Sequence, residues 1–200
     1  MRHYILYLVL FMLVVAGVLA EPASSEWLRF DRVLIDQGQI WRLFSANFVH
    51  LSVNHALGNA IGIGLLAYIA GQYLNNKHGL LLIVWCGLWV GCGLYWYAEY
   101  LQRYVGLSGA LHGLLLVAPF VSRYYSKKIA WSFALLISAK IIWEQTPWYN
   151  DMAMLGYIGG RVEVNSHLMG YLAGVLYLSA LYFLKPELVN HSDEKSLDDA

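Results

Sequence analysis

Apolar residues occur along this chain in long blocks that short polar intervals separate. The apolar layer of a membrane is about 30 Å thick, and a helix needs about 20 mostly apolar residues to cross it. By that measure the sequence predicts six spanning helices, over approximately residues 4–20, 51–73, 80–97, 108–121, 129–143 and 167–184.

The fourth predicted helix, residues 108–121, is short for a span. Irregular backbone at membrane depth is tolerated only where protein surrounds it or where it lines a water-filled cavity. We therefore expect this helix to begin below the membrane surface, with its opening loop sheltered by neighbouring helices.

The first apolar segment has two interpretations. Arg2, the apolar run and the small residue Ala20 before Glu21 are also typical of a cleavable signal peptide. We favour a retained helix, because the run has the length of a span and its removal would leave an odd number of helices.

Residues 21–50 form the longest polar interval and mix charged residues with aromatic and aliphatic ones. This composition predicts a structured loop in the membrane interface, with Trp27 and Trp41 at the level of the lipid headgroups. We expect Arg42 to hold the loop through hydrogen bonds to carbonyl groups or a carboxylate.

Composition supports an all-α, polytopic membrane protein. Hydrophobic residues make up 59% of the 200 residues and charged residues only 13%, too few to cover a soluble globule of this size. The formal net charge is zero and there is no basic run, which argues against nucleic-acid binding. Cys86 and Cys92 lie in one apolar segment and are interpreted as buried thiols.

The loop cations predict an orientation. One side of the membrane would carry Arg2, Lys77, Arg123, Lys127, Lys128, Lys185 and Lys195, and the other Arg29, Arg32, Arg42, Arg103 and Arg161. Because all the loop lysines fall on the first side, we expect that side to be cytoplasmic, with both termini inside.

Lys140, near the outer end of the fifth helix, would snorkel or pair with Glu144. The polar residues 185–200 predict a disordered cytoplasmic tail.

Ser108 is the strongest candidate for a nucleophile. It opens the fourth predicted helix within the sequence Gly-Leu-Ser-Gly-Ala-Leu-His-Gly, residues 106–113. Gly106 would let the backbone bend before the hydroxyl, and Gly109 would let another helix approach. The same sequence also suits an ordinary packing turn.

His55 and Asn59 lie four residues apart, so a helix places them on one face. Both side chains can donate hydrogen bonds toward one point. The alternative is a structural role, in which neighbouring helices satisfy both polar groups.

His167 shares a helix face with Gly170 and Gly174, which form a groove that admits another helix at close range. If the partner is the helix of Ser108, His167 reaches the serine hydroxyl. His112, four residues after Ser108, is a second candidate base. Proton abstraction within one helix has poor geometry, so we expect His112 to support His167 by stacking or hydrogen bonding.

These residues together predict a hydrolytic site with a Ser-His dyad. His55, Asn59 and the backbone N–H of Ser108 would stabilise the oxyanion. No carboxylate is evident in the sequence to orient the histidine, so packing must hold the imidazole ring. No metal and no cofactor are expected.

The sequence resembles the rhomboid family of intramembrane serine proteases. The resemblance rests on Trp41-Arg42, His50, His55 with Asn59, Gly106-x-Ser108-Gly109, and His167-x-x-Gly170-x-x-x-Gly174, in that order. It implies the six-transmembrane-helix rhomboid fold over residues 1–184, with the interfacial loop at about 21–50 and the tail at 185–200. It also implies Ser108 as nucleophile, His167 as general base, and His55 and Asn59 as oxyanion stabilisers.

The sequence of residues 106–113 is more similar to the rhombosortase branch of the family. In that branch a histidine often replaces the tyrosine that stacks on the catalytic histidine. That position is His112 here. The resemblance implies a bacterial inner-membrane enzyme whose site opens to the outer side and whose substrates are membrane-anchored proteins with Gly-Gly-type carboxy-terminal sorting tails.

Two other functions remain open from the sequence. His50, His55, His112 and His167 at similar depth would also suit a haem or metal protein, although the glycines around Ser108 would then lack a purpose. A non-catalytic binder of transmembrane segments would have no need for both Ser108 and His167.

Overall fold

The computed structural model describes residues 4–74 and 76–189. Arg2, Lys195 and the predicted tail beyond residue 189 lie outside the described residues. Within the described part, six helices are long, and each overlaps one predicted segment: α1 (Ile5–Leu19), α5 (Val53–Ala70), α6 (Asn76–Tyr97), α7 (Ser108–Val121), α8 (Lys127–Glu144) and α10 (Val164–Leu184).

Among the described residues, three helices are long and apolar enough to cross a membrane: Val53–Ala70, Lys77–Tyr97 and Val164–Leu184. Helices α1 and α7 are apolar but shorter. The protein is therefore a polytopic helical membrane protein. That all six long helices cross the membrane stays a prediction.

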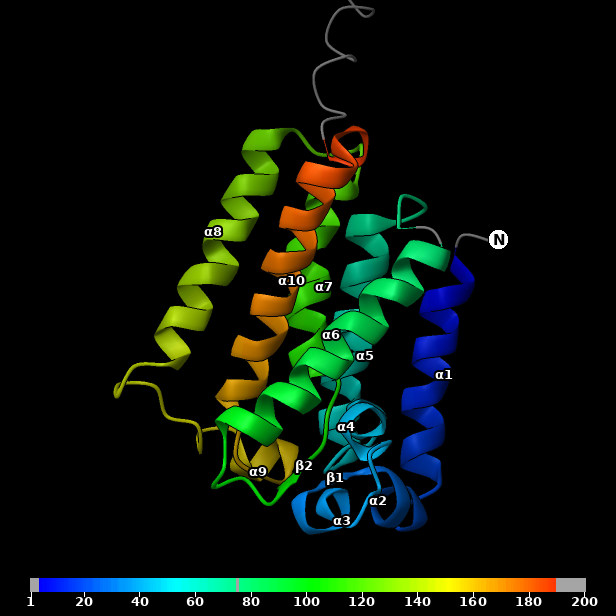
Figure 1. Ribbon diagram of the computed structural model, residues 1–200, viewed down its shortest axis with the longest axis vertical. Helices are drawn as coiled ribbons and strands as arrows, with labels where there is room; N and C mark the ends of the chain where they lie inside the picture. Colours follow the sequence, from blue (N-terminus) through cyan, green and yellow to red (C-terminus); the bar gives the residue numbers. More distant parts are fainter. Residues whose placement is uncertain (1–3, 75, 190–200) are drawn as a thin grey trace, which may run out of the picture.

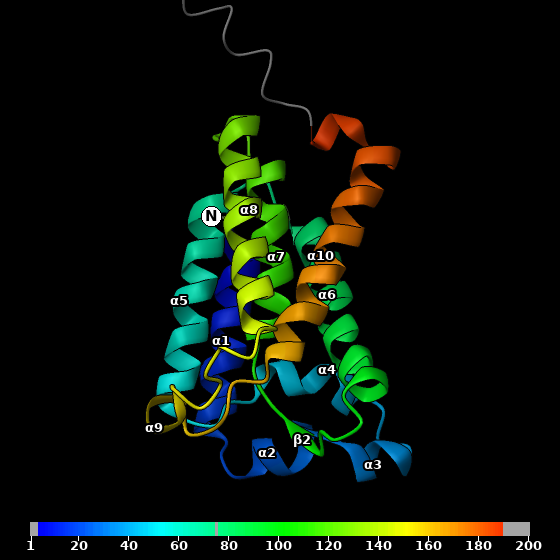
Figure 2. The same ribbon diagram turned by 90° about the vertical axis from the view of Figure 1, so that its left-hand side faces the viewer.

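The long helices run up and down in one bundle (Figures 1 and 2). The two described ends of the chain lie at one end of this bundle, and the segment between α1 and α5 lies at the other (Figure 1). Lys77 and Lys127 fall at the first end, at the starts of α6 and α8. Arg42 and Arg103 lie in α4 and β2, at the second end. The orientation of the protein in the membrane stays a prediction.

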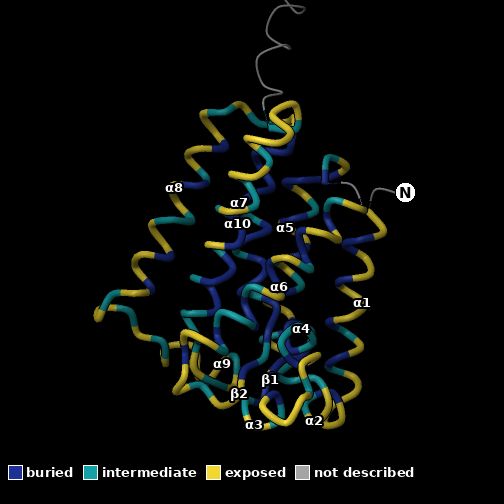
Figure 3. The backbone as a smooth tube through the Cα atoms, in the orientation of Figure 1, coloured by how far each residue is buried: buried dark blue, intermediate teal, exposed yellow. Residues whose placement is uncertain are grey.

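Helix α7 is the centre of the bundle. From Gly109 to Val121 its residues are buried except His112 and Leu115 (Figure 3). The outer helices instead expose large apolar side chains, including Leu8 on α1, Ile61 on α5 and Leu135 on α8. An apolar exterior of this kind is unfavourable in water and suits contact with lipid.

Glycines bring α7 and α10 into backbone contact. A Cβ atom added at Gly170 would overlap the carbonyl oxygen of Gly109, and one at Gly174 would lie 2.7 Å from the carbonyl oxygen of Gly113. One at Gly109 would lie 2.8 Å from the Ser166 carbonyl oxygen. The predicted partnership between the helix of Ser108 and the helix of His167 is therefore confirmed.

The loop before α5 is structured, as the sequence predicted. It contains α2 (Ala23–Leu28), β1 (Phe30–Asp31), α3 (Arg32–Asp36), α4 (Arg42–Ser45) and the 3₁₀ helix η2 (Ala46–Phe48). The buried Arg42 donates to the carbonyl oxygens of Arg29 (2.9 Å) and Glu26 (2.7 Å) and to Gln39 Oε1 (2.8 Å). In these contacts Arg42 therefore binds two backbone carbonyl groups and one side-chain amide, and no carboxylate.

This loop also reaches the segment that leads to Ser108. Strand β1 pairs antiparallel with β2 (Arg103–Tyr104), with Phe30 opposite Tyr104. Arg32 donates to four carbonyl oxygens at the end of α6 and just beyond it, those of Leu94, Tyr95, Ala98 and Leu101. The short elements α9 (Leu155–Ile158) and η3 (Pro186–Leu188) complete the described chain.

We predict that Gly170→Ala destabilises the protein by roughly 1–3 kcal/mol or more, because the added methyl group forces α10 away from α7. Gly64→Ala on α5 is the matched control, because nothing lies within 4 Å of its added Cβ. Thermal unfolding in detergent should show a lower Tm for the first variant and an unchanged or higher Tm for the second. Equal Tm values would contradict the close contact.

Candidate active site

Ser108 is the first residue of α7, and a fixed turn presents it. Gly106 has φ +122°, a conformation that favours glycine. Its N–H donates to the Ala46 carbonyl oxygen (3.0 Å), and its own carbonyl oxygen accepts from Tyr104 Oη (2.8 Å). Burial raises the pKa of Tyr104 to about 12, so this hydroxyl stays a donor. The loop and β2 together therefore set the direction in which Ser108 leaves the turn.

Gly106 also leaves room for His55. A Cβ atom at Gly106 would lie 2.8 Å from both Cε1 and Nε2 of the His55 ring. The sequence predicted Gly106 as a bend, and the structure adds this second, steric requirement.

His167 approaches the serine from α10. Its Nε2 lies 3.1 Å from Ser108 Oγ, and the residue is buried. Glu163 caps α10 by accepting from the Asn165 N–H (3.2 Å), and Ser166 Oγ donates to the Glu163 carbonyl oxygen (2.7 Å). These contacts fix the first turn of α10 and with it the position of the imidazole.

His112 contacts the backbone of Ser108 rather than its hydroxyl. Nδ1 of His112 lies 2.7 Å from the Ser108 carbonyl oxygen, so this nitrogen carries the proton and donates it. The His112 ring stacks on the His167 ring, with centroids 4.2 Å apart and an interplanar angle of 30°. Of the two candidate bases, His167 is therefore the one in contact with the serine hydroxyl.

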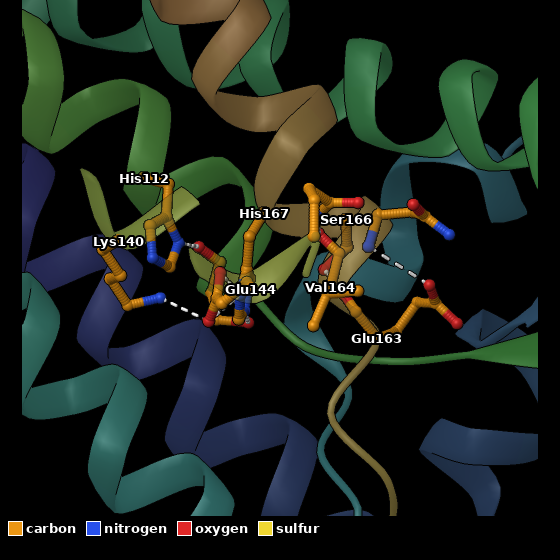
Figure 4. A network of polar contacts seen from close by, with 10 residues as sticks. His112, Lys140, Glu144, Glu163, Val164, Ser166 and His167 are labelled. Carbon is orange, nitrogen blue, oxygen red and sulfur yellow. Dashed lines mark hydrogen bonds and ion pairs between the residues drawn. The ribbon is translucent and has the colours of Figure 1, made fainter. Parts of the chain in front are cut away.

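Sequence reasoning missed a carboxylate at this site. Both oxygens of Glu144, the last residue of α8, lie near His167 Nδ1, at 3.1 and 3.0 Å (Figure 4). Lys140, one turn earlier, donates to Glu144 Oε1 (2.6 Å). The Lys140 and Glu144 pair was among the expectations, but its position beside His167 was not. The expectation that packing alone holds the imidazole is therefore wrong.

The signal for Glu144 was present in the chain. A carboxylate at the end of an apolar span is costly unless it is paired. Lys140, one turn earlier on the same helix, provides that pairing in the sequence alone. The meeting of the end of α8 with the start of α10 has no local signal in the sequence.

His55 and Asn59 lie on one face of α5, as predicted. Ser52 caps this helix by accepting from the His55 N–H (3.1 Å), and Asn59 Nδ2 donates to the His55 carbonyl oxygen (3.3 Å). Both residues line a cavity of about 810 Å³ that Ser108, His167 and Glu144 also line. The structure thus brings together the serine, the imidazole and both predicted donors around one open space.

The four candidate histidines form two pairs: His50 and His55 meet edge to face (centroids 5.1 Å apart), and His112 stacks on His167. His112, Glu144 and His167 offer ligand atoms within 4.8 Å of one another, a distance at which they could hold a metal ion. The two nitrogens of His167 instead contact other groups of the site, Nε2 with Ser108 Oγ and Nδ1 with Glu144. Burial lowers the pKa of His50 to about 3, which keeps that ring neutral.

Fold and site together define a polytopic helical membrane protein with a serine-histidine contact buried among its helices. Residues 37–183, most of the chain, match the family model of the Rhomboid domain. The chain therefore belongs to the rhomboid family.

A curated relative supports this assignment. The chain is 26% identical over 171 residues to the protein named "Putative rhomboid protease YdcA" of Bacillus subtilis (strain 168). The match covers 83% of this chain and 81% of that protein. The narrower resemblance to rhombosortases stays a prediction.

We predict that Gly106→Ala slows labelling of the serine by a fluorophosphonate probe about 100-fold, the order expected when reacting groups shift by about 1 Å. The added methyl group collides with His55 and strains the turn before Ser108. Gly38→Ala is the matched control, because its φ of +97° gives a similar backbone strain with nothing within 4 Å. Equal labelling rates of the two variants would contradict the role assigned to this turn.

Proposed function

We propose that this protein is an intramembrane serine endopeptidase in which Ser108 is the nucleophile and His167 the general base. The observation that carries the proposal is the 3.1 Å contact between Ser108 Oγ and His167 Nε2, beside a cavity of about 810 Å³. Membership of the rhomboid family supports the same activity.

The geometry supports a two-step acyl transfer. His167 Nε2 takes the proton of Ser108 while Oγ forms a bond to the carbonyl carbon of the scissile peptide, whose oxygen becomes an oxyanion. The carbon–nitrogen bond then breaks, and the leaving amine takes the proton from His167. Water then gives a proton to His167 Nε2 while its oxygen bonds to the acyl carbon. The bond from that carbon to Ser108 Oγ breaks, Oγ takes the proton back from His167, and the product leaves with a new carboxyl group.

His55, Asn59 and the backbone N–H of Ser108 are proposed to stabilise the oxyanion. The first two line the same cavity as Ser108, and the third lies at the start of α7, where the helix dipole favours negative charge. A donor of this kind typically contributes about 100- to 1,000-fold to kcat. Six further residues are proposed to support the site without contacting the substrate: Arg42, His112, Gly106, Gly109, Gly170 and Gly174.

The rival functions receive less support. A metal site at His112, Glu144 and His167 would need a nitrogen of His167, and both of its nitrogens contact other groups, Ser108 Oγ and Glu144. A non-catalytic binder of transmembrane segments has no need for a serine hydroxyl hydrogen-bonded to a buried imidazole.

For the substrate, we propose membrane-anchored proteins with a Gly-Gly-type carboxy-terminal sorting tail, cut at or near the outer surface of the bacterial inner membrane. Glycines weaken a helix and so expose a peptide bond that a regular helix shields. The site residues come from the starts of α7 and α10 and the end of α8. These helix ends lie toward the side of the bundle opposite the described chain ends (Figure 1). With six spans this arrangement supports cytoplasmic termini and a site that opens outward.

We predict that Ser108→Ala abolishes cleavage of a reconstituted protein with a Gly-Gly sorting tail, because no other group of the site supplies the attacking oxygen. Ser122→Ala is the matched control: this buried serine follows α7 at its far end. Gel analysis of the released tail should show cleavage by the control alone. Release by purified Ser108→Ala would overturn the proposed function.

We also predict that replacing the Gly-Gly pair of this substrate by Leu-Leu lowers its cleavage rate at least about tenfold, because leucine stabilises the helix by about 1 kcal/mol per residue relative to glycine. Mass spectrometry of the products locates the cut. Equal rates for the two substrates would refute the proposed substrate class while leaving the protease assignment intact.

A further inference from the structure

We infer that Glu144 is a positioning residue that converts the predicted dyad into a Ser-His-Glu triad, with Lys140 keeping its carboxylate charged. This inference rests on the proposed function. It is carried by the contacts between three helices: α7 with Ser108, α10 with His167, and α8 with Glu144. Figure 4 shows Glu144 beside His167.

Glu144 is placed to fix the tautomer of His167. The carboxylate is acceptor-only, so His167 Nδ1 carries the proton and donates to its oxygens at 3.0 and 3.1 Å. The opposite nitrogen, Nε2, then has a free lone pair that faces Ser108 Oγ. This is the tautomer that a general base needs, and the contact with Nδ1 also sets the ring orientation.

The contact gains strength during the reaction. When His167 takes the serine proton, it becomes an imidazolium. The imidazolium forms an ion pair with Glu144 that the resting site lacks. An interaction that is stronger in the transition state than in the ground state raises kcat. Burial enhances the effect, because only 3% of the Glu144 side chain and 9% of the His167 side chain are exposed.

Lys140 explains how a buried carboxylate stays ionised beside a neutral imidazole. An unpaired buried charge is costly and tends to be neutralised by a proton. The Lys140 ammonium donates to Glu144 Oε1 at 2.6 Å, while 47% of its own side chain remains exposed. The role assigned to Lys140 is therefore to act through Glu144.

The contacts of Glu144 differ from those of an ion pair that only stabilises one helix. Lys140 and Glu144 lie one turn apart on the same helix, and such a pair forms without help from another element. Here both carboxylate oxygens also lie within 3.1 Å of a nitrogen on α10. That second contact is the one that the base requires.

The test compares Glu144→Gln, Glu144→Asp and Ser108→Ala in the reconstituted cleavage assay. We expect Glu144→Gln to lower kcat about 100- to 10,000-fold with KM within about threefold, as for the orienting carboxylates of other serine hydrolases. Glu144→Asp, which keeps the charge, should recover part of kcat. If Ser108→Ala is inactive and Glu144→Gln keeps the kcat of the unmodified protein, the inference fails while the proposed function stands.

Chemical rescue separates positioning from folding. In Glu144→Ala, formate can enter from the open cavity and accept the hydrogen bond from His167 Nδ1. We expect formate to raise kcat of folded Glu144→Ala at least about tenfold over chloride at equal ionic strength, and to leave Ser108→Ala inactive. Absence of rescue in a variant that elutes as folded protein would count against the triad.

Lys140→Met tests whether Lys140 acts through Glu144. If Lys140 acts only through Glu144, Lys140→Met should lower kcat in the unmodified protein and have no further effect in Glu144→Gln. Equal fold-losses in both backgrounds would show that Lys140 acts independently of Glu144 and would overturn that part of the inference.

Discussion

The backbone contact between α7 and α10 is the interaction on which the rest of the structure depends. Gly109 and Gly113 on one helix face Gly170 and Gly174 on the other, and a single methyl group at Gly170 would collide with the backbone of α7. Only at this separation does a side chain as short as histidine span from α10 to the first hydroxyl of α7. The small-residue interface thus brings the two helices together and places His167 within hydrogen-bond distance of Ser108.

A second constraint is the cost of polar groups among apolar helices. Four contacts pair the polar side chains around Ser108: Ser108 Oγ contacts His167, His167 contacts Glu144, Glu144 contacts Lys140, and His112 contacts the Ser108 carbonyl oxygen. The partners come from three different helices, so the hydrogen bonds that satisfy the polar groups also hold the helices in register. The contacts that hold these helices together are therefore also the contacts of the proposed catalytic residues.

Much of this arrangement could be predicted because it is local in sequence. The length of apolar runs predicts the long helices, and spacings of three and four residues place His55 with Asn59, and His167 with Gly170, on common faces. The contacts that sequence could not predict are those between elements. The pairing of Phe30 with Tyr104, the approach of His55 to Gly106 and the meeting of Glu144 with His167 all depend on how separate segments pack.

We propose that packing of α7 against α10 makes Ser108 the reactive serine of this membrane protein. Peptide mapping of the purified, folded protein after reaction with a fluorophosphonate tests it most directly, because the adduct records which hydroxyl is activated. We predict a single adduct, on Ser108. An adduct on another serine, or no adduct at all in folded protein, would contradict this account.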